Sequence, residues 1–335
     1  MMHWRLRRWR EAWEARKVRL RWRLRWGASV ADPPPAPLET PTFDGSGQAT
    51  HPDVLCPKRP WNGHRWWMVM TPFPFNQEGL ENPSLLVSDD GRRWEVPPGV
   101  VNPLVPTPKH GFHADPDALL SPDGRSLWIY YLHTIRHQDQ RLLRLVSDDG
   151  RLWRGPETLL TVPYQEIRSP AIVHWSEGGD GTAEGWFLMW CVDMTGGDAP
   201  RIVWRKSRDG AVWSPPWPVK FDRPGWFPSH LDVQWDGWRG AFVMVAQLAP
   251  EGGGGQALYL AQSRDGIDWR IGRRPLLAPW DAPPWASLTL YRASLLPRDD
   301  GGLDLWYGAR GPGNVNRIAF LALAATMVEK ALRWE

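Results

Sequence analysis

The stretch Ser88-Asp89-Asp90-Gly91-Arg92-Arg93-Trp94 recurs in varied form four times in this chain of 335 residues. The shared pattern is Ser-x-Asp-Gly-x-x-Trp. The other copies begin at Ser147, Ser207 and Ser263, so successive copies lie 59, 60 and 56 residues apart. Each copy follows an apolar, strand-like run, and Asp-Gly supplies the positive φ that a tight hairpin turn requires. Four copies at one period predict a repeat whose unit contains a β-hairpin.

A second series of segments runs in step with the first. Its members are His51-Pro-Asp, Asp115-Pro-Asp, Ser169-Pro-Ala, His230-Leu-Asp and Tyr291-Arg-Ala, and each is followed by a turn and an aromatic strand. Together the two series define five units of about 58 residues over 51–327. Because a four-stranded unit repeated radially is a propeller blade, we predict an all-β fold, a five-bladed β-propeller.

The N-terminal region differs from the rest in composition. Residues 1–26 form a basic, Trp- and Arg-rich arm with ten Arg and Lys residues against Glu11 and Glu14. Residues 27–50 are predicted to be a Pro-rich linker, and residues 328–335 a C-terminal tail. The arm has two interpretations: Trp9 and Trp13 have helical spacing, whereas 18–26 alternates like a strand. Such a strand would be a candidate to complete the fifth blade and close the ring.

Composition limits the partners and the compartment. The chain has no run of 18 apolar residues and no continuous apolar segment of the secretory type, so we expect neither a transmembrane helix nor a signal peptide. The compartment stays open between cytoplasm and virion. The arm is a candidate for docking onto a protein partner or an assembly, with an anionic membrane surface as an alternative; we do not expect nucleic acid as a partner. Cys56 and Cys191 are too few for a disulfide scaffold.

Several segments resemble the five-bladed β-propeller glycosidases, the superfamily of arabinofuranosidases, xylosidases and fructosidases. They are His51-Pro-Asp-Val-Leu, Trp66-Trp-Met-Val-Met-Thr-Pro72, Glu81-Asn-Pro-Ser, Asp115-Pro and Ser169-Pro-Ala. The likeness is greatest to uncharacterised members, some of them bacteriophage structural proteins. The hairpin repeat also resembles the Asp-box of sialidases, which have six blades.

The resemblance implies three catalytic carboxyl groups at the propeller axis. They are a base or nucleophile from blade one, a pKa-tuning carboxylate from blade two and an acid from blade three. The matching residues here are Asp53, Asp115 and Glu166, chosen from the wider set of Asp53, Glu81, Asp115, Asp117, Glu166, Asp193 and Asp232. Blade one, however, begins with His51 where the family has Asp, and Glu166 lies four residues before Pro170.

Further residues are expected to bind the sugar, Trp226 by stacking on the apolar face of a sugar ring and the others through polar contacts. They are His51, Glu81, His113, His230, Asp232, Arg292 and Trp226. Three His-x-Asp pairs, beginning at His51, His113 and His230, have the spacing that puts both side chains on one strand face. Such pairs suit either a metal ion or hydrogen bonds to sugar. Because the spacing is no recognised zinc signature, we predict hydrogen bonding, with no metal and no cofactor.

These features predict a carbohydrate-active propeller that works as a glycoside hydrolase through axial carboxylates. Glycoside cleavage requires two carboxyl groups flanking the scissile bond, one of them protonated. The alternative is a non-catalytic glycan-binding protein, or a structural protein of a phage virion at its surface or tail, docked through the arm. Whether the chain is an enzyme is left open by the sequence.

Overall fold

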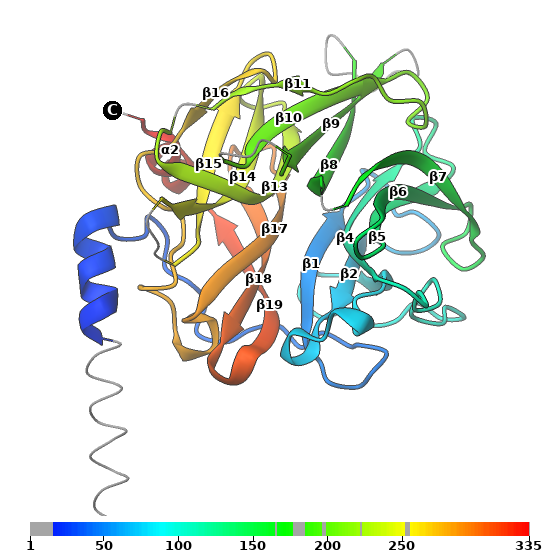
Figure 1. Ribbon diagram of the computed structural model, residues 1–335, viewed down its shortest axis with the longest axis horizontal. Helices are drawn as coiled ribbons and strands as arrows, with labels where there is room; N and C mark the ends of the chain where they lie inside the picture. The colour runs from blue at the N-terminus through cyan, green and yellow to red at the C-terminus, as the bar shows by residue number, and fades with distance from the viewer. Residues whose placement is uncertain are drawn as a thin grey trace, which may run out of the picture.

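Five sheets follow one another along the chain and are arranged around a common axis (Figure 1). The computed structural model describes residues 16–164, 166–176, 185–195, 199–221, 223–251 and 255–334. The inner strands β1, β4, β8, β13 and β17 contact one another in a closed cycle, with β17 returning to β1. This confirms the predicted five-bladed, almost entirely β architecture.

Each blade is a consecutive piece of the chain. Blade one contains β1 (Ala49–Leu55), β2 (Trp66–Pro72) and β3 (Ser84–Ser88), and blade two contains β4 (Phe112–Leu120), β5 (Leu127–Thr134), β6 (Asp139–Ser147) and β7 (Arg154–Pro163). Blade three contains β8 (Ile167–Trp175), β9 (Trp186–Asp193), β10 (Arg201–Ser207) and β11 (Trp217–Pro218), and blade five contains β17 (Thr289–Pro297), β18 (Leu303–Gly311) and β19 (Val315–Leu323). Blade four contains β13 (Trp226–Asp236), β14 (Ala241–Pro250), β15 (Ala257–Ser263) and β16 (Asp268–Ile271), and β12 (Lys220–Phe221) runs parallel to β16. Short helices η1 (Pro74–Asn76), η2 (Glu78–Leu80), η3 (Pro284–Ala286), η4 (Pro312–Asn314) and α2 (Ala325–Leu332) complete the described elements.

The repeated hairpin turns share one hydrogen-bond pattern. In the first, the Ser88 hydroxyl donates to Asp90 Oδ1 and accepts from Gly91 N, while Asp90 Oδ1 also accepts from the amides of Arg92 and Arg93. The same bonds recur at Ser147, Ser207 and Ser263. The Ser and Asp of the pattern therefore satisfy backbone donors that the turn leaves unpaired.

The same turns join neighbouring blades. Trp306 Nε1 of blade five donates to Gly91 O of blade one at 2.7 Å, and Trp190 Nε1 of blade three donates to Gly266 O of blade four at 2.8 Å. Tyr130 of blade two makes the equivalent bond to Gly210 O of blade three at 3.0 Å. Gly266 has φ +74°, and a Cβ there would lie 2.7 Å from the Trp190 ring. Glycine is therefore needed both for the turn and for the aromatic contact.

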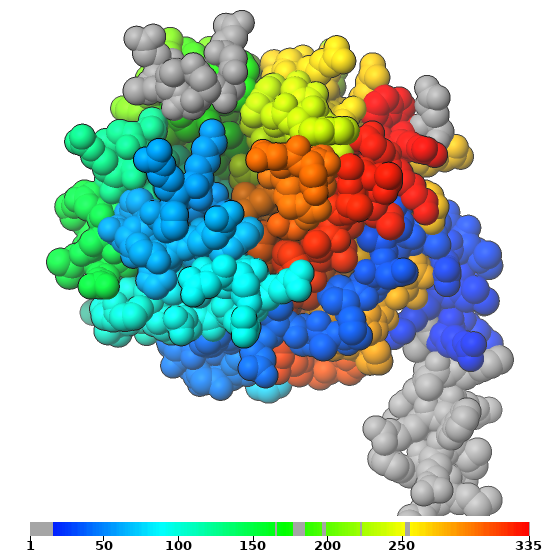
Figure 2. Space-filling model, turned by 180° about the vertical axis from the view of Figure 1, so that it is seen from behind, coloured from blue at the N-terminus to red at the C-terminus, as the bar shows by residue number. Residues whose placement is uncertain are grey.

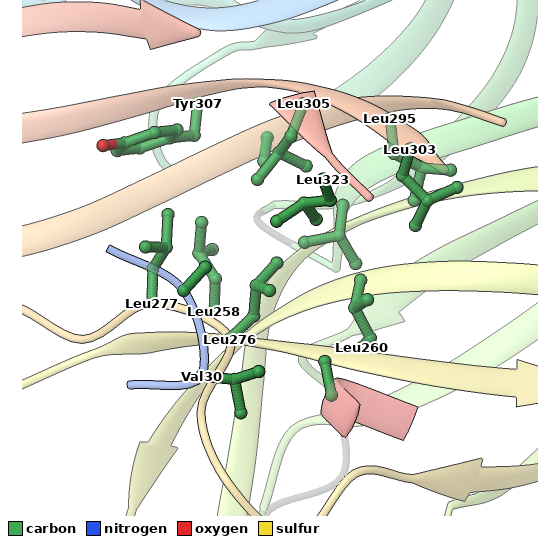
Figure 3. Close-up of a cluster of buried hydrophobic side chains, with 14 of the residues drawn as sticks. Val30, Leu258, Leu260, Leu276, Leu277, Leu295, Leu303, Leu305, Tyr307 and Leu323 are labelled. Atoms are coloured by element: carbon green, nitrogen blue, oxygen red, sulfur yellow. The ribbon is translucent and has the colours of Figure 1, made fainter. Parts of the chain in front are cut away.

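Apolar side chains fill the spaces between blades. Figure 3 shows the cluster between blades four and five, where Leu258 and Leu260 of β15 face Leu303 and Leu305 of β18. Val30, from the segment before β1, is part of this cluster. α2 covers its edge with Val328, Ala331 and Leu332, so the expected C-terminal tail contains a packed helix.

The described part of the arm, residues 16–26, is helical, and the strand interpretation of 18–26 is therefore wrong. The physical reason is the placement of Trp22 and Trp26, which are four residues apart and pack together on the propeller. Trp22 lies 6.2 Å from Trp280, and Trp26 lies 4.7 Å from Trp226, measured between ring centroids. No helix of the described residues is long and apolar enough to cross a membrane.

The fifth blade is bordered by the linker and not by the arm. Within the described residues its sheet has three strands, and Leu38 N donates to Ile318 O of β19 at 2.8 Å. The amides of Val30 and Ala31 donate to the carbonyls of Pro275 and Leu276. In Figure 2 this segment, coloured blue, runs along the surface of the propeller. The Pro-rich segment is thus extended, as expected, but bound to the domain.

We expect Tyr130→Phe to lower the free energy of unfolding by about 0.5–1.5 kcal/mol, because it removes the bond to Gly210 O and leaves that carbonyl unpaired. Urea denaturation measures this loss. Tyr307→Phe is the matched control, since the buried Tyr307 hydroxyl has no hydrogen-bond partner and its removal should cost nothing. Equal losses in both variants would show that the inter-blade bond does not stabilise the ring.

Candidate active site

The leading residues of the five inner strands meet at the axis because each inner strand is irregular there. In β1, Thr50 pairs with Thr71 and Asp53 with Val69, so His51 and Pro52 together oppose one residue of β2. The same irregularity occurs in β4, β8 and β17, whereas in β13 the single residue Ser229 is inserted before His230, which pairs with Gln247. His51, Asp115 and Ser169 have φ values of +50°, +49° and +53°. Non-glycine residues held in this left-handed region cluster at functional sites.

The first layer brings together His51, Asp115 and His230. His51 Nε2 lies 3.3 Å and His230 Nδ1 lies 3.4 Å from Asp115 Oδ1. All three side chains are buried, and these three atoms have no hydrogen-bond partner among the residues that the structure describes. They fit one ligand sphere, since they lie within 4.8 Å of one another. Two imidazoles and a carboxylate in this arrangement are a ligand set for a divalent transition metal.

The charges of this layer favour a bound cation. Burial lowers the pKa of His51 to about 3 and also lowers the pKa of His230, so both imidazoles are neutral at pH 7. Burial opposes ionisation of Asp115, but the two imidazoles and Arg292 hold its pKa well below the usual range. A carboxylate thus meets two neutral imidazoles in a space closed to solvent, where a metal would compensate its charge.

Neighbouring side chains fix the orientation of His51. Thr71 Oγ1 lies 3.1 Å and Glu81 Oε1 lies 3.5 Å from His51 Nδ1. With the ring proton on Nδ1 facing these oxygens, Nε2 presents its lone pair to the side of Asp115. Burial raises the pKa of Glu81 well above its ordinary value, and the charges of Asp115 and Glu78 add to this effect. The raised pKa makes Glu81 a better proton acceptor than an ordinary carboxylate.

A second layer, two residues further along the strands, contains Asp53, Asp117 and Asp232. Asp53 accepts a hydrogen bond from Ala118 N of blade two, Asp117 from Ile172 N of blade three, and Asp232 from Leu295 N of blade five. Burial raises the pKa of Asp53 to about 6 and that of Asp232 to about 8, and it raises the pKa of Asp117 well above the ordinary value. These carboxyl groups join neighbouring inner strands.

Arg292 lies between the two layers. Its guanidinium donates to Pro170 O at 3.0 Å and approaches Asp117 Oδ1 at 3.5 Å and Asp115 Oδ1 at 4.0 Å. The side chain is 1% exposed, so it cannot contact a sugar directly. Its charge instead compensates the buried carboxylates.

The structure distributes the predicted site residues over several places. His51, Asp115, His230 and Glu81 come together at the axis, whereas Asp53 and Asp232 lie in the second layer. Glu166 is only half-buried, and the charged groups that act on its pKa are Asp193 and Arg205. The candidate Asp193 is paired with Arg201.

Two predicted sugar contacts have other partners. His113 is buried against Tyr131 and His133, and its Nδ1 lies 3.0 Å from Asn82 Oδ1. Trp226 packs against Trp26 of the arm helix, and the guanidinium of Arg223 lies 4.5 Å from its ring centroid. Trp226 therefore contributes to holding the arm.

Sequence reasoning missed Ser169, Thr71 and Tyr291 as members of the first layer. Ser169 N donates to Asp115 Oδ2 at 2.9 Å, and the Tyr291 ring lies 5.1 Å from His51 and 4.5 Å from His230. Ser169 and Tyr291 occupy the leading positions of their repeat segments. Their shared repeat position was the available signal. Thr71 carries no such signal, because only strand pairing brings it next to Thr50 and His51.

Comparison with known proteins supports a carbohydrate-active propeller. An A type blood N-acetyl-alpha-D-galactosamine deacetylase of Flavonifractor plautii aligns with this chain over 320 residues at 30% identity. The alignment covers 81% of this chain. The chain spans 41% of the length of that relative. A crystal structure of an N-acetylgalactosamine deacetylase from F. plautii, in complex with blood group B trisaccharide, matches with a TM-score of 0.80 and 25% identity, over 91% of this chain and 98% of that one.

More distant structures share the fold. A glycoside hydrolase matches with a TM-score of 0.60 and 14% identity, covering 87% of this chain and 91% of that one. An α-L-arabinofuranosidase of Fusarium graminearum matches with a TM-score of 0.54 and 11% identity, covering 88% of this chain and 98% of that one. No family model matches the chain. The chain is thus a five-bladed propeller, similar in sequence and fold to an N-acetylgalactosamine deacetylase.

The second layer predicts a specific pH dependence of stability. The pKa of Asp53 is raised to about 6 in the folded state. Its contribution to the free energy of unfolding is therefore fully present below about pH 4 and is lost as pH rises through 6. Asp53→Asn keeps an acceptor for Ala118 N and does not titrate. The variant should therefore gain about 1–3 kcal/mol relative to the wild type between pH 4 and pH 7 in urea denaturation. Asp89→Asn, at an exposed site, is the control. If the free energy of unfolding changed with pH in the same way in Asp53→Asn and in the wild type, the raised pKa of Asp53 would be contradicted.

Proposed function

We propose that this chain removes the acetyl group from an N-acetylated sugar by metal-assisted hydrolysis of the amide bond. The observation that carries the proposal is the convergence of three buried, unpartnered ligand atoms, His51 Nε2, Asp115 Oδ1 and His230 Nδ1. The similarity to an N-acetylgalactosamine deacetylase supports the same chemistry. We infer an N-acetylhexosamine as the substrate class.

The first layer fits a divalent metal better than it fits a hydrogen-bonded network. Neutral imidazole nitrogens and a carboxylate oxygen suit zinc, manganese, iron or cobalt, and three protein ligands leave coordination positions for water and substrate. When bound, such a metal polarises the amide carbonyl and lowers the pKa of a bound water. The ordered second shell supports this assignment, since Thr71 and Glu81 face the far side of the His51 ring.

Glu81 is the proposed proton acceptor and donor of the reaction. Amide hydrolysis requires removal of a proton from water and delivery of a proton to the leaving nitrogen. The raised pKa of Glu81 allows one carboxyl group to perform both transfers. Its carboxyl group lies 3.5 Å from His51, so it borders the proposed metal ligands.

Two other functions have less support. Glycoside hydrolysis by Asp53 and Glu166 requires both groups to flank the substrate, whereas Asp53 is engaged with Ala118 N and Glu166 is placed with Asp193. A virion structural role has no counterpart among the relatives compared above. An assay of the products distinguishes the three functions. Glycoside hydrolysis releases a sugar, a structural protein releases no product, and the proposed deacetylase releases acetate.

Asp115→Asn should abolish metal binding and reduce acetate release by at least about a hundredfold, because it removes the only anionic ligand. Metal content is measured by mass spectrometry after dialysis against zinc or manganese. Activity is measured as acetate and free amine released from an α-linked N-acetylgalactosaminide. Asp53→Asn is the matched control and should retain both metal and activity. Loss of activity in Asp53→Asn, with aryl glycoside cleavage by the wild type, would favour glycoside hydrolysis instead.

Glu81→Gln should lower kcat by roughly 10²–10⁴-fold while leaving metal content and KM nearly unchanged, because proton transfer is lost but the ligands stay in place. The pH–rate profile provides a second readout, since the limb that reports Glu81 should disappear. Glu95→Gln, which removes one carboxylate at an exposed site, controls for the change of charge. Full activity of Glu81→Gln would refute the assigned role.

A further inference from the structure

The helix of residues 16–26 presents two different faces. Trp22 and Trp26 lie on one face and pack on the propeller. Leu20 and Leu24 are offset from them by two residues, which is about 200° around a helix, and so lie on the opposite face. Leu20 is 56% and Leu24 79% exposed. The helix thus displays an apolar pair to solvent although its tryptophans are partly buried against the propeller.

Cations surround this apolar pair. Residues 16–26 contain six Arg and Lys residues and no Asp or Glu. Arg16 and Lys17 are four and three residues before Leu20, and Arg21 is three residues before Leu24, so all three border the apolar pair. They are exposed. Arg23 and Arg25 have other contacts: Arg23 Nε lies 3.3 Å from Asp281 of the propeller, and Arg25 lies over the ring of Trp26 in the same helix.

The position of the helix makes this face accessible along its length. In Figure 1 the helix, in blue, stands at the side of the propeller and outside its blades. The contacts of Trp22 with Trp280 and of Trp26 with Trp226 fix it in that place. A flat surface can therefore approach the outer face of the helix without meeting the blades.

We propose that this face docks the propeller onto an anionic lipid bilayer. The membrane interface accepts both parts of the pattern, since Leu side chains enter the boundary between headgroups and acyl chains while Arg and Lys contact anionic headgroups. A nucleic acid would use the cations but not the exposed leucines. A protein groove that takes a helix engages a longer apolar stripe than this pair. The proposal is independent of the proposed deacetylase activity.

Vesicle co-sedimentation of the full chain tests the proposal. The chain should bind vesicles of phosphatidylcholine with phosphatidylglycerol and bind phosphatidylcholine alone much more weakly, and raised salt should release it. The double variant Leu20→Ser, Leu24→Ser should weaken binding on the order of tenfold. Arg16→Gln with Arg21→Gln should weaken it about 25-fold, because each basic residue near the surface contributes a factor of about five.

The control replaces two exposed apolar residues elsewhere, Val101→Ser with Leu152→Ser, which are 82% and 78% exposed in the wild type. This variant should bind vesicles as the wild type does. Thermal unfolding of all variants excludes a folding defect, since every substituted side chain is exposed. Absence of vesicle binding, equal binding to both vesicle types, or wild-type binding by the leucine variant would each overturn the proposal. So would double-stranded RNA binding that leaves vesicle binding undetectable.

Discussion

The need to compensate buried carboxylates at the propeller axis governs the rest of this structure. Asp53, Asp115, Asp117 and Asp232 are all removed from water. An unpaired buried charge is costly, so each of these groups has a partner or a raised pKa. In the second layer the partners are backbone amides of the neighbouring blade and the guanidinium of Arg292. The same bonds that compensate the carboxylates therefore close the ring.

The two layers show how neighbouring positions on the same inner strands acquire different chemistry. Residues two apart on the same inner strands form both layers, yet the second layer is engaged in inter-blade bonds and the first leaves three ligand atoms unpartnered. The difference arises from the neighbours. Asp115 has two imidazoles beside Oδ1, whereas Asp53 has the amide of Ala118 at its carboxylate. A stabilising layer beneath the proposed metal ligands would keep them rigid, as a preorganised site requires.

The repeat of short segments made the fold predictable, because turn chemistry is local. Ser, Asp and Gly at fixed offsets satisfy the backbone of one hairpin wherever it occurs, and four such hairpins at one period imply one architecture. The arm was not predictable in the same way. Its alternating Arg and apolar residues suit a strand. The segment is nevertheless helical, and as a helix it places Trp22 and Trp26 against Trp280 and Trp226, which are distant in sequence.

The sequence by itself determined the number of blades, the positions of the inner strands and the candidate residues His51, Asp115 and His230, since these follow from repeat phase, whereas Glu81 was a candidate through the resemblance of Glu81-Asn-Pro-Ser. Only the tertiary structure decided which carboxyl groups join blades and which lies beside two imidazoles. That choice depends on contacts between residues such as His51 and Asp115, which are 64 positions apart and meet because the strands are irregular at the axis. No local pattern encodes such a distance, because it is produced by closing the ring.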